Sequence, residues 1–163
     1  MLNSDDYRRI FNYNFKVLHA FFDTLNKLPW ETASRNMEAS HHSLRNIFLH
    51  VLNMMDGWIN HNAMGRQGEV MQHFRDYDDF RSMAEVKEQM EQVEAGVSDF
   101  LNRLEDRMLT KTITAPWLLG DHKLGDVLMQ VTLEEADHVG EIIALLWQLD
   151  IEPPEMTWIM NTK

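Results

Sequence analysis

Apolar side chains recur at steps of three and four along four segments of the chain, with polar side chains between them. This spacing places the apolar side chains on one face of an α-helix. The segments span roughly residues 5–28, 43–61, 82–104 and 123–149. Pro29 ends the first segment and Pro153 closes the fourth, as expected where helices stop. Each segment is therefore predicted to be an amphipathic helix that packs against the others.

The segments between these helices indicate how the helices are connected. Residues 31–40 are polar and favour a loop, and residues 62–81 form a second, long connection without a clear period. Residues 110–122 combine β-branched residues with proline and glycine, which indicates an extended crossover or a short hairpin. We predict an all-α four-helix bundle, a single domain over residues 1–163, with a long loop after the second helix and a crossover before the fourth. With connections this long, the helices need not simply alternate in direction.

Composition narrows the class of protein. The formal net charge is −11, so the surface should repel phosphate backbones, and we expect no nucleic-acid partner. No apolar run approaches the length of about 18 residues that a membrane span needs, and we expect no membrane partner. The chain has no cysteine, and its first residues lack the pattern of a signal peptide. These features favour a cytoplasmic location.

Two polar residues interrupt the apolar fourth helix. On a helical wheel with Val127 at zero, Glu134 falls about 20° to one side and His138 about 20° to the other, at the expected centre of the buried stripe. A lone carboxylate in a core is costly, so it needs a partner. Glu134 and His138 could pair with each other or with polar groups of neighbouring helices. Alternatively, both could bind a metal ion, since bundles build metal sites from inward-facing carboxylates and imidazoles.

A metal site needs a further ligand from another helix, and His50 is the histidine inside the second helix. On the wheel it lies at the flank of the apolar stripe, where one helix meets its neighbour. By itself His50 is better explained as a histidine at the boundary of the core than as a ligand. The other histidines are less favourable: His19 is off the stripe, His41 and His42 are at a helix start, His61 is at a helix end, His73 is in the long loop, and His122 is at the entry to the fourth helix.

Three stretches resemble a known family. They are YNF at residues 13–15, HVLNMMDGW at 50–58 and HVGEIIALLWQLDIEPP at 138–154. Together they resemble the DinB/YfiT-like superfamily of small bacterial four-helix proteins, and the resemblance covers nearly the whole chain. It implies a divalent metal ion (zinc, nickel, iron or manganese) held by His50, Glu134 and His138, with Glu134 at a position where the family more often has histidine.

The resemblance also suggests a function. It implies a metal-dependent transferase that activates a low-molecular-weight thiol in stress or detoxification. Because the chain has no cysteine, the thiol would belong to a small-molecule co-substrate that reacts with an electrophile. The alternatives are a non-catalytic metal-binding or structural stress-response protein, and a family member without metal in which Glu134 and His138 form a buried ion pair. Apolar surface on the first and third predicted helices further suggests a homodimer.

Overall fold

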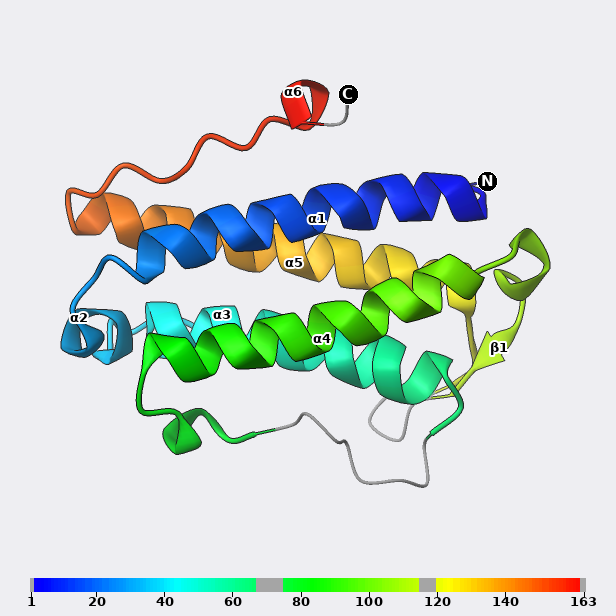
Figure 1. Ribbon diagram of the computed structural model, residues 1–163, viewed down its shortest axis with the longest axis horizontal. Helices are drawn as coiled ribbons and strands as arrows, with labels where there is room; N and C mark the ends of the chain where they lie inside the picture. Colours follow the sequence, from blue (N-terminus) through cyan, green and yellow to red (C-terminus); the bar gives the residue numbers. More distant parts are fainter. Residues whose placement is uncertain (1, 67–74, 115–119, 162–163) are drawn as a thin grey trace.

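The computed structural model describes residues 2–66, 75–114 and 120–161, and its main feature is a bundle of four long helices (Figure 1). These helices are α1 (Ser4–Leu25), α3 (Leu44–Met55), α4 (Met83–Arg103) and α5 (Leu124–Gln148). Helix α1 packs against α4 and α5, and α3 packs against the same two helices. In Figure 1, α1 and α5 run in one direction while α3 and α4 run in the other. The predicted all-α four-helix bundle is confirmed, and its helices do not simply alternate in direction.

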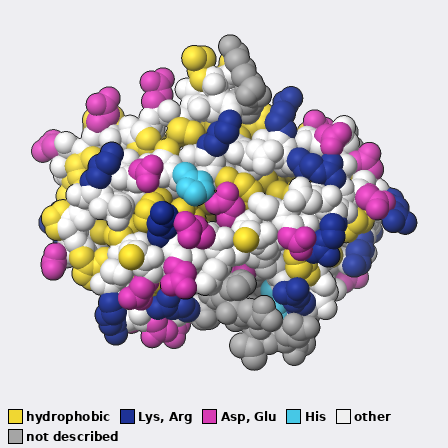
Figure 2. Space-filling view, viewed as in Figure 1, with side chains coloured by type: hydrophobic (Ala, Val, Ile, Leu, Met, Phe, Trp, Pro, Cys, Tyr) yellow, Lys and Arg dark blue, Asp and Glu magenta, His cyan; other side chains and the backbone are white. Residues whose placement is uncertain are grey.

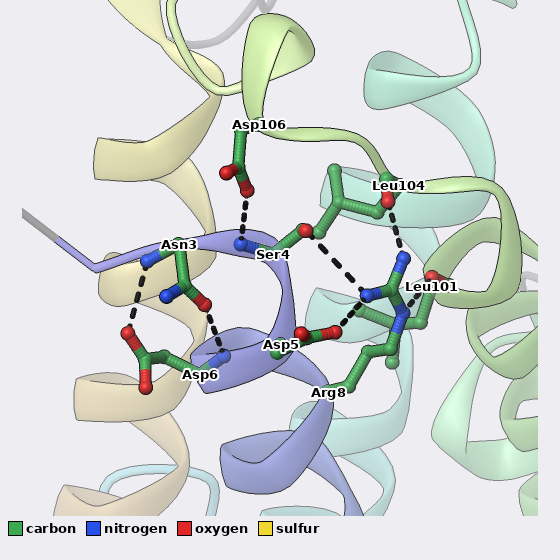
Figure 3. Close-up of polar contacts among 8 residues, drawn as sticks. All are labelled: Asn3, Ser4, Asp5, Asp6, Arg8, Leu101, Leu104 and Asp106. Atoms are coloured by element: carbon green, nitrogen blue, oxygen red, sulfur yellow. Dashed lines mark hydrogen bonds and ion pairs between the residues drawn. The ribbon is translucent and has the colours of Figure 1, made fainter.

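Local sequence signals fix the start of α1 (Figure 3). Asn3 caps the helix: its side-chain oxygen accepts from the backbone N–H of Asp6 at 2.9 Å, and the Asp6 carboxylate accepts from the Asn3 N–H at 3.0 Å. One turn later, the Arg8 guanidinium donates to the backbone carbonyls of Leu101 and Leu104 at the end of α4. Carbonyls at a helix end lack partners within the helix, so Arg8 ties two bundle helices together there.

The apolar stripes of the four helices meet in one core. Aromatic side chains from α1 form a large part of it, and Phe22 of α1 packs against Phe48 of α3 with ring centroids 6.1 Å apart. The largest side chains that are almost completely buried are Phe11, Phe21, Leu25, Leu44, Ile47, Phe48, Leu49, Leu52, Met55, Ile59, Phe80 and Met90. Burial of such apolar surface is the main stabilising contribution to the fold.

The predicted second helix changes its winding before its end. Helix α3 is followed directly by a π-helix, η1 (Asp56–Ala63), all of whose residues are buried. The Asn60 side chain there donates to the Asp56 carboxylate at 2.9 Å and to the backbone carbonyl of Val93, on α4, at 3.2 Å. Asp56 and Asn60 are therefore accommodated inside the bundle by a bond to each other and by the bond from Asn60 to α4.

Shorter elements lie in the connections. A five-residue helix, α2 (Trp30–Ser34), occupies the beginning of the segment predicted to be a loop, because Pro29 starts rather than only ends helical structure there. The segment 110–122 contains the short hairpin: β1 (Thr112–Ile113) pairs antiparallel with β2 (His122–Lys123). The remaining elements are η2 (Tyr77–Asp79), η3 (Asp106–Met108) and α6 (Trp158–Asn161). Part of the long 62–81 connection, with His73, lies outside the described residues.

The face of the bundle shown in Figure 2 carries charged side chains of both signs. Figure 2 shows basic and acidic side chains interspersed over the face in view, with hydrophobic side chains between them. The part of this face that the structure describes has no continuous basic stripe of the kind that follows a phosphate backbone. None of the helices in the described ranges is long and apolar enough to cross a bilayer. After α5 the chain turns back and runs beside α1 to α6 (Figure 1).

Candidate metal centre

Three histidines from different parts of the chain meet beside α5. They are His41 from the loop before α3, His50 from α3 and His138 from α5. One ring nitrogen of each lies within 4.8 Å of one ring nitrogen of the other two. The rings of His41 and His50 stack at 3.8 Å between centroids, and the His138 ring stands at a steep angle to both, 5.3 Å and 4.6 Å away. Among the residues that the structure describes, this is the one group of potential ligands close enough to share a metal ion.

The loop before α3 is folded so that His41 reaches the other two histidines. His42 has a φ of 71°, in the left-handed region, and its carbonyl accepts from the Met37 N–H at 2.6 Å. Ser43 then caps α3 by accepting from the Asn46 N–H at 3.1 Å. The sharp turn at His42 therefore brings the preceding histidine back along the helix that it precedes.

Glu141 of α5 fastens this loop to the fourth long helix. Its carboxylate accepts from the backbone N–H of Ser40 at 2.8 Å and from the Ser40 hydroxyl at 2.6 Å. The same carboxylate lies 3.4 Å from Nδ1 of His138. Glu141 is therefore placed to orient two histidines, His138 directly and His41 through its neighbour in the loop.

The Nδ1 atoms of all three histidines have polar neighbours. The Tyr77 hydroxyl lies 3.5 Å from Nδ1 of His41 and 3.4 Å from Nδ1 of His50. Glu141 occupies the corresponding position at His138. A hydrogen bond from Nδ1–H fixes the tautomer in which Nε2 carries the lone pair. This arrangement leaves the Nε2 atoms of the three rings as the natural ligand atoms.

Burial favours the neutral form of two of the clustered histidines, His41 and His50. Burial, followed by the neighbouring histidines His41 and His138, lowers the pKa of His50 to about 4. Burial and His138 also lower the pKa of His41. Burial alone would raise the pKa of Glu141, but the hydrogen bonds from Ser40 and His138 outweigh it and hold that pKa below its usual value. At neutral pH the site therefore combines neutral imidazoles at His41 and His50 with the Glu141 carboxylate.

Two of the three residues singled out in the sequence, His50 and His138, lie together, whereas Glu134 is not part of this cluster. The Glu134 carboxylate accepts from the side chain of Gln130, one turn earlier on α5, at 2.9 Å. Glu134 and His138 are both half-buried, not at the centre of the apolar stripe. The buried acid of α5 is the adjacent Glu135, with 3% of its surface exposed.

The wheel put Glu134 and His138 at the centre of the buried stripe because Val127 was taken as that centre. In the structure Val127 lies at the edge of the stripe. The buried positions of α5 centre near Leu124 and Ile142, which lie about 60° from Val127. His138 is therefore about 40° and Glu134 about 80° from the true centre. From the flank of the stripe His138 contacts His50 on α3. Glu134 instead bonds to Gln130 on its own helix.

His41 is the ligand candidate that the sequence did not reveal. In the sequence it stands at a predicted helix start, with no period that indicates the direction of its side chain. Its position depends on the left-handed turn at His42 and on the bonds from Ser40 to Glu141. The only local signal is the pair His41-His42 immediately before the capping serine, since histidine tolerates a left-handed turn better than most residues.

Comparison with known proteins agrees with the architecture. Residues 15–142, which include most of the four long helices and all three clustered histidines, match the DinB superfamily. No curated protein sequence matches the chain. The family match covers well over half of the chain and confirms the resemblance read from the three sequence stretches, so the protein belongs to the DinB superfamily.

Proposed function

We propose that this protein is a divalent-metal-dependent transferase that activates a low-molecular-weight thiol, with His41, His50 and His138 as the metal ligands. The observation that supports the proposal is the meeting of three imidazoles from three separate segments, with ligand atoms within 4.8 Å of one another. Membership of the DinB superfamily supports metal binding independently.

The donor set fits a divalent transition metal. Neutral imidazole is a good ligand for zinc, nickel and iron, and a lowered pKa keeps His50 in the metal-binding form even below neutral pH. Three protein ligands leave coordination positions open to a small molecule, in contrast to a closed structural site. A cation held in this way lowers the pKa of a thiol or water bound beside it and so supplies a nucleophile at neutral pH.

The protein's own residues would position the ligands and keep the site accessible. Glu141 would accept from Nδ1–H of His138, and the Tyr77 oxygen would accept from the Nδ1–H groups of His41 and His50. These bonds would direct the Nε2 atoms toward a common centre. All three histidines are half-buried, so a small thiol can approach from solvent. Because the chain lacks cysteine, the thiol must come from the co-substrate.

Metal titration of two variants tests the ligand set. His41→Ala should weaken the affinity for zinc by more than the 10- to 100-fold that is typical of losing an outer-shell partner. Glu134→Gln is the matched control, and its zinc affinity should equal that of the wild type. Competition with a chromogenic chelator measures both. Weak binding by Glu134→Gln and unchanged binding by His41→Ala would instead favour the set His50, Glu134 and His138.

Reaction kinetics test the transferase itself. Protein loaded with zinc, nickel, iron or manganese is mixed with bacillithiol, cysteine or coenzyme A and the electrophile monochlorobimane. We expect the loaded protein to accelerate conjugation with at least one of these thiols, and the His41→Ala variant to lose the acceleration. If metal binds at about one ion per chain but no thiol reacts faster, the transferase proposal fails and a non-catalytic metal-binding protein remains.

A further inference from the structure

A cavity of about 420 Å³ lies between α1 and α5, away from the three histidines. Its walls are mainly apolar and belong to α1, α5 and the C-terminal α6. The residues that line it are Ile10, Tyr13, Asn14, Val17, Thr132, Glu135, Ala136, Val139, Gly140, Ile143 and Trp158. On a helical wheel these positions of α5 lie on the side opposite Glu134, His138 and Glu141. The cavity has the volume and apolar lining that are typical of sites for small organic molecules.

Two buried polar side chains face this apolar cavity. Glu135 is 3% exposed and Asn14 is 4% exposed, and both belong to the lining. Neither Oε2 of Glu135 nor Nδ2 of Asn14 has a hydrogen-bond partner in the structure. A buried polar atom without a partner costs about 1–3 kcal/mol, so such atoms are rare unless a ligand or another group satisfies them.

The charge state of Glu135 indicates what kind of group would satisfy it. Burial raises the pKa of this carboxyl to about 8, and the neighbouring Asn14 side chain acts in the opposite direction. The carboxyl is therefore mostly protonated at neutral pH, and the end of the cavity is uncharged. A neutral group that both donates and accepts a hydrogen bond can pair with this acid and with the amide of Asn14 at once.

The C-terminal segment forms one wall of the cavity and is fastened to α1. The Tyr13 hydroxyl donates to the backbone carbonyl of Met156 at 2.8 Å. The rings of Tyr13 and Trp158 meet edge to face at 5.0 Å, and the Arg9 guanidinium lies 5.3 Å from the Trp158 ring. These contacts hold the Trp158 ring beside α1 as part of the cavity wall.

We propose that this cavity binds a small, uncharged, mainly apolar molecule that carries one hydroxyl group, such as a phenol or an alcohol. The apolar body lies against Val17, Ile143 and Trp158. The hydroxyl accepts a hydrogen bond from the Asn14 amide and donates one to the Glu135 carboxyl. This site is separate from the histidine cluster and does not depend on the proposed transferase activity.

Calorimetric titration with two probes tests the proposal on the full-length protein. The probes are p-cresol, which has the hydroxyl, and p-xylene, which has a methyl group in its place. We expect p-cresol to bind about tenfold more tightly than p-xylene, the discrimination that a net hydrogen-bond gain of about 1.4 kcal/mol provides. Equal affinity for the two probes, or no binding of p-cresol, would overturn the proposal.

Substitution of Gly140 tests the location without endangering the fold. A Cβ added at Gly140 meets no atom within 4 Å, although this residue lines the cavity. Gly140→Leu should therefore fold normally, occupy the mouth of the cavity and reduce p-cresol affinity at least tenfold. Ala95→Leu, at an exposed position of α4, is the matched control and should bind p-cresol as the wild type does. Unchanged binding by Gly140→Leu would exclude this cavity.

A second variant tests the polar end. Glu135→Leu keeps the bulk of the side chain but removes the carboxyl, and circular dichroism checks that the variant is folded. We expect the preference for p-cresol over p-xylene to shrink to near unity while p-xylene affinity stays the same or rises. A preference as large as in the wild type would show that Glu135 does not contact the hydroxyl, and would overturn its assigned role.

Discussion

Glu135 makes the stability of this protein depend on pH in a direction opposite to that of an ordinary surface carboxylate. In the folded chain burial raises the pKa of its carboxyl from its ordinary value of 4.5 to about 8. Between these pH values the folded state keeps a proton that the unfolded chain has released. The free energy of unfolding therefore falls as the pH rises through this window.

We predict that this fall amounts to as much as about 1.4 kcal/mol per pH unit and that Glu135→Gln removes it. Glutamine resembles the protonated acid in shape but does not titrate. Urea unfolding at pH 7 and pH 8, in chelator to exclude metal, measures the effect. His50 acts in the opposite direction, but its pKa of about 4 in the folded protein confines its effect to the range below roughly pH 6.5. Equal slopes for the two proteins would show that Glu135 is ionised in the folded state.

The histidine cluster shows how far single residues can be placed from sequence. His50 and His138 are found because each lies on a periodic helix, where spacing fixes direction. His41 follows no period, and its ring reaches His50 only because the loop turns at His42 and is bonded to Glu141. Glu134 and Glu135 are adjacent in the sequence but about 100° apart on the wheel. Deciding which of them is buried requires the true centre of the stripe, which depends on where α1 and α3 pack.

At the scale of elements, two helical glycines are expected to respond in opposite ways to the same substitution. A Cβ at Gly96 of α4 would lie 2.6 Å from the amide atoms of Asn60, whose side chain is buried and bonded to Asp56 and Val93. A Cβ at Gly140 of α5 would meet no atom within 4 Å.

We predict that Gly96→Ala destabilises the protein by about 1–3 kcal/mol, since it overpacks the core and disturbs a buried hydrogen bond. Gly140→Ala should stabilise it by about 0.5–1 kcal/mol, because alanine loses less conformational freedom in a helix than glycine does. Urea unfolding of the two variants in parallel measures both values. Similar effects at the two positions would mean that α4 does not approach η1 as closely as the structure has it.

Helices could be predicted where the spacing of apolar residues by three and four continues over several turns without interruption. The starts of α3 and α4 follow from capping serines, and the end of α5 from the residues before the double proline. The change to a π-helix at Asp56 was not predictable from the spacing of apolar residues. Within it the buried Asn60 side chain gains a partner on α4, which only the packing of the two helices reveals. The hairpin at 110–122 was one of two alternatives, since two-residue strands give too little alternation to decide.

At the scale of the whole molecule, the apolar faces of α1 and α4 are used inside the chain. Both helices bury their stripes in the bundle core, so they do not supply the free apolar surface from which a homodimer was expected. The large apolar side chains that are exposed in the described residues lie on α5 and α6 instead: Leu133, Trp147, Ile159 and Met160, each more than half exposed. An exposed tryptophan of this kind is typical of a surface that another protein covers.

We therefore still predict a homodimer, but with its interface at α5 and α6. Light scattering at micromolar concentration should give twice the chain mass of 19.3 kDa. Trp147→Lys places a charge at the more exposed of the two large apolar side chains of α5 and should reduce the mass to that of one chain. Gln148→Lys makes the same change one residue later, at an exposed polar position, and should leave the dimer intact. A wild-type mass of one chain would refute the dimer, and a dimer that survives Trp147→Lys would place its interface elsewhere.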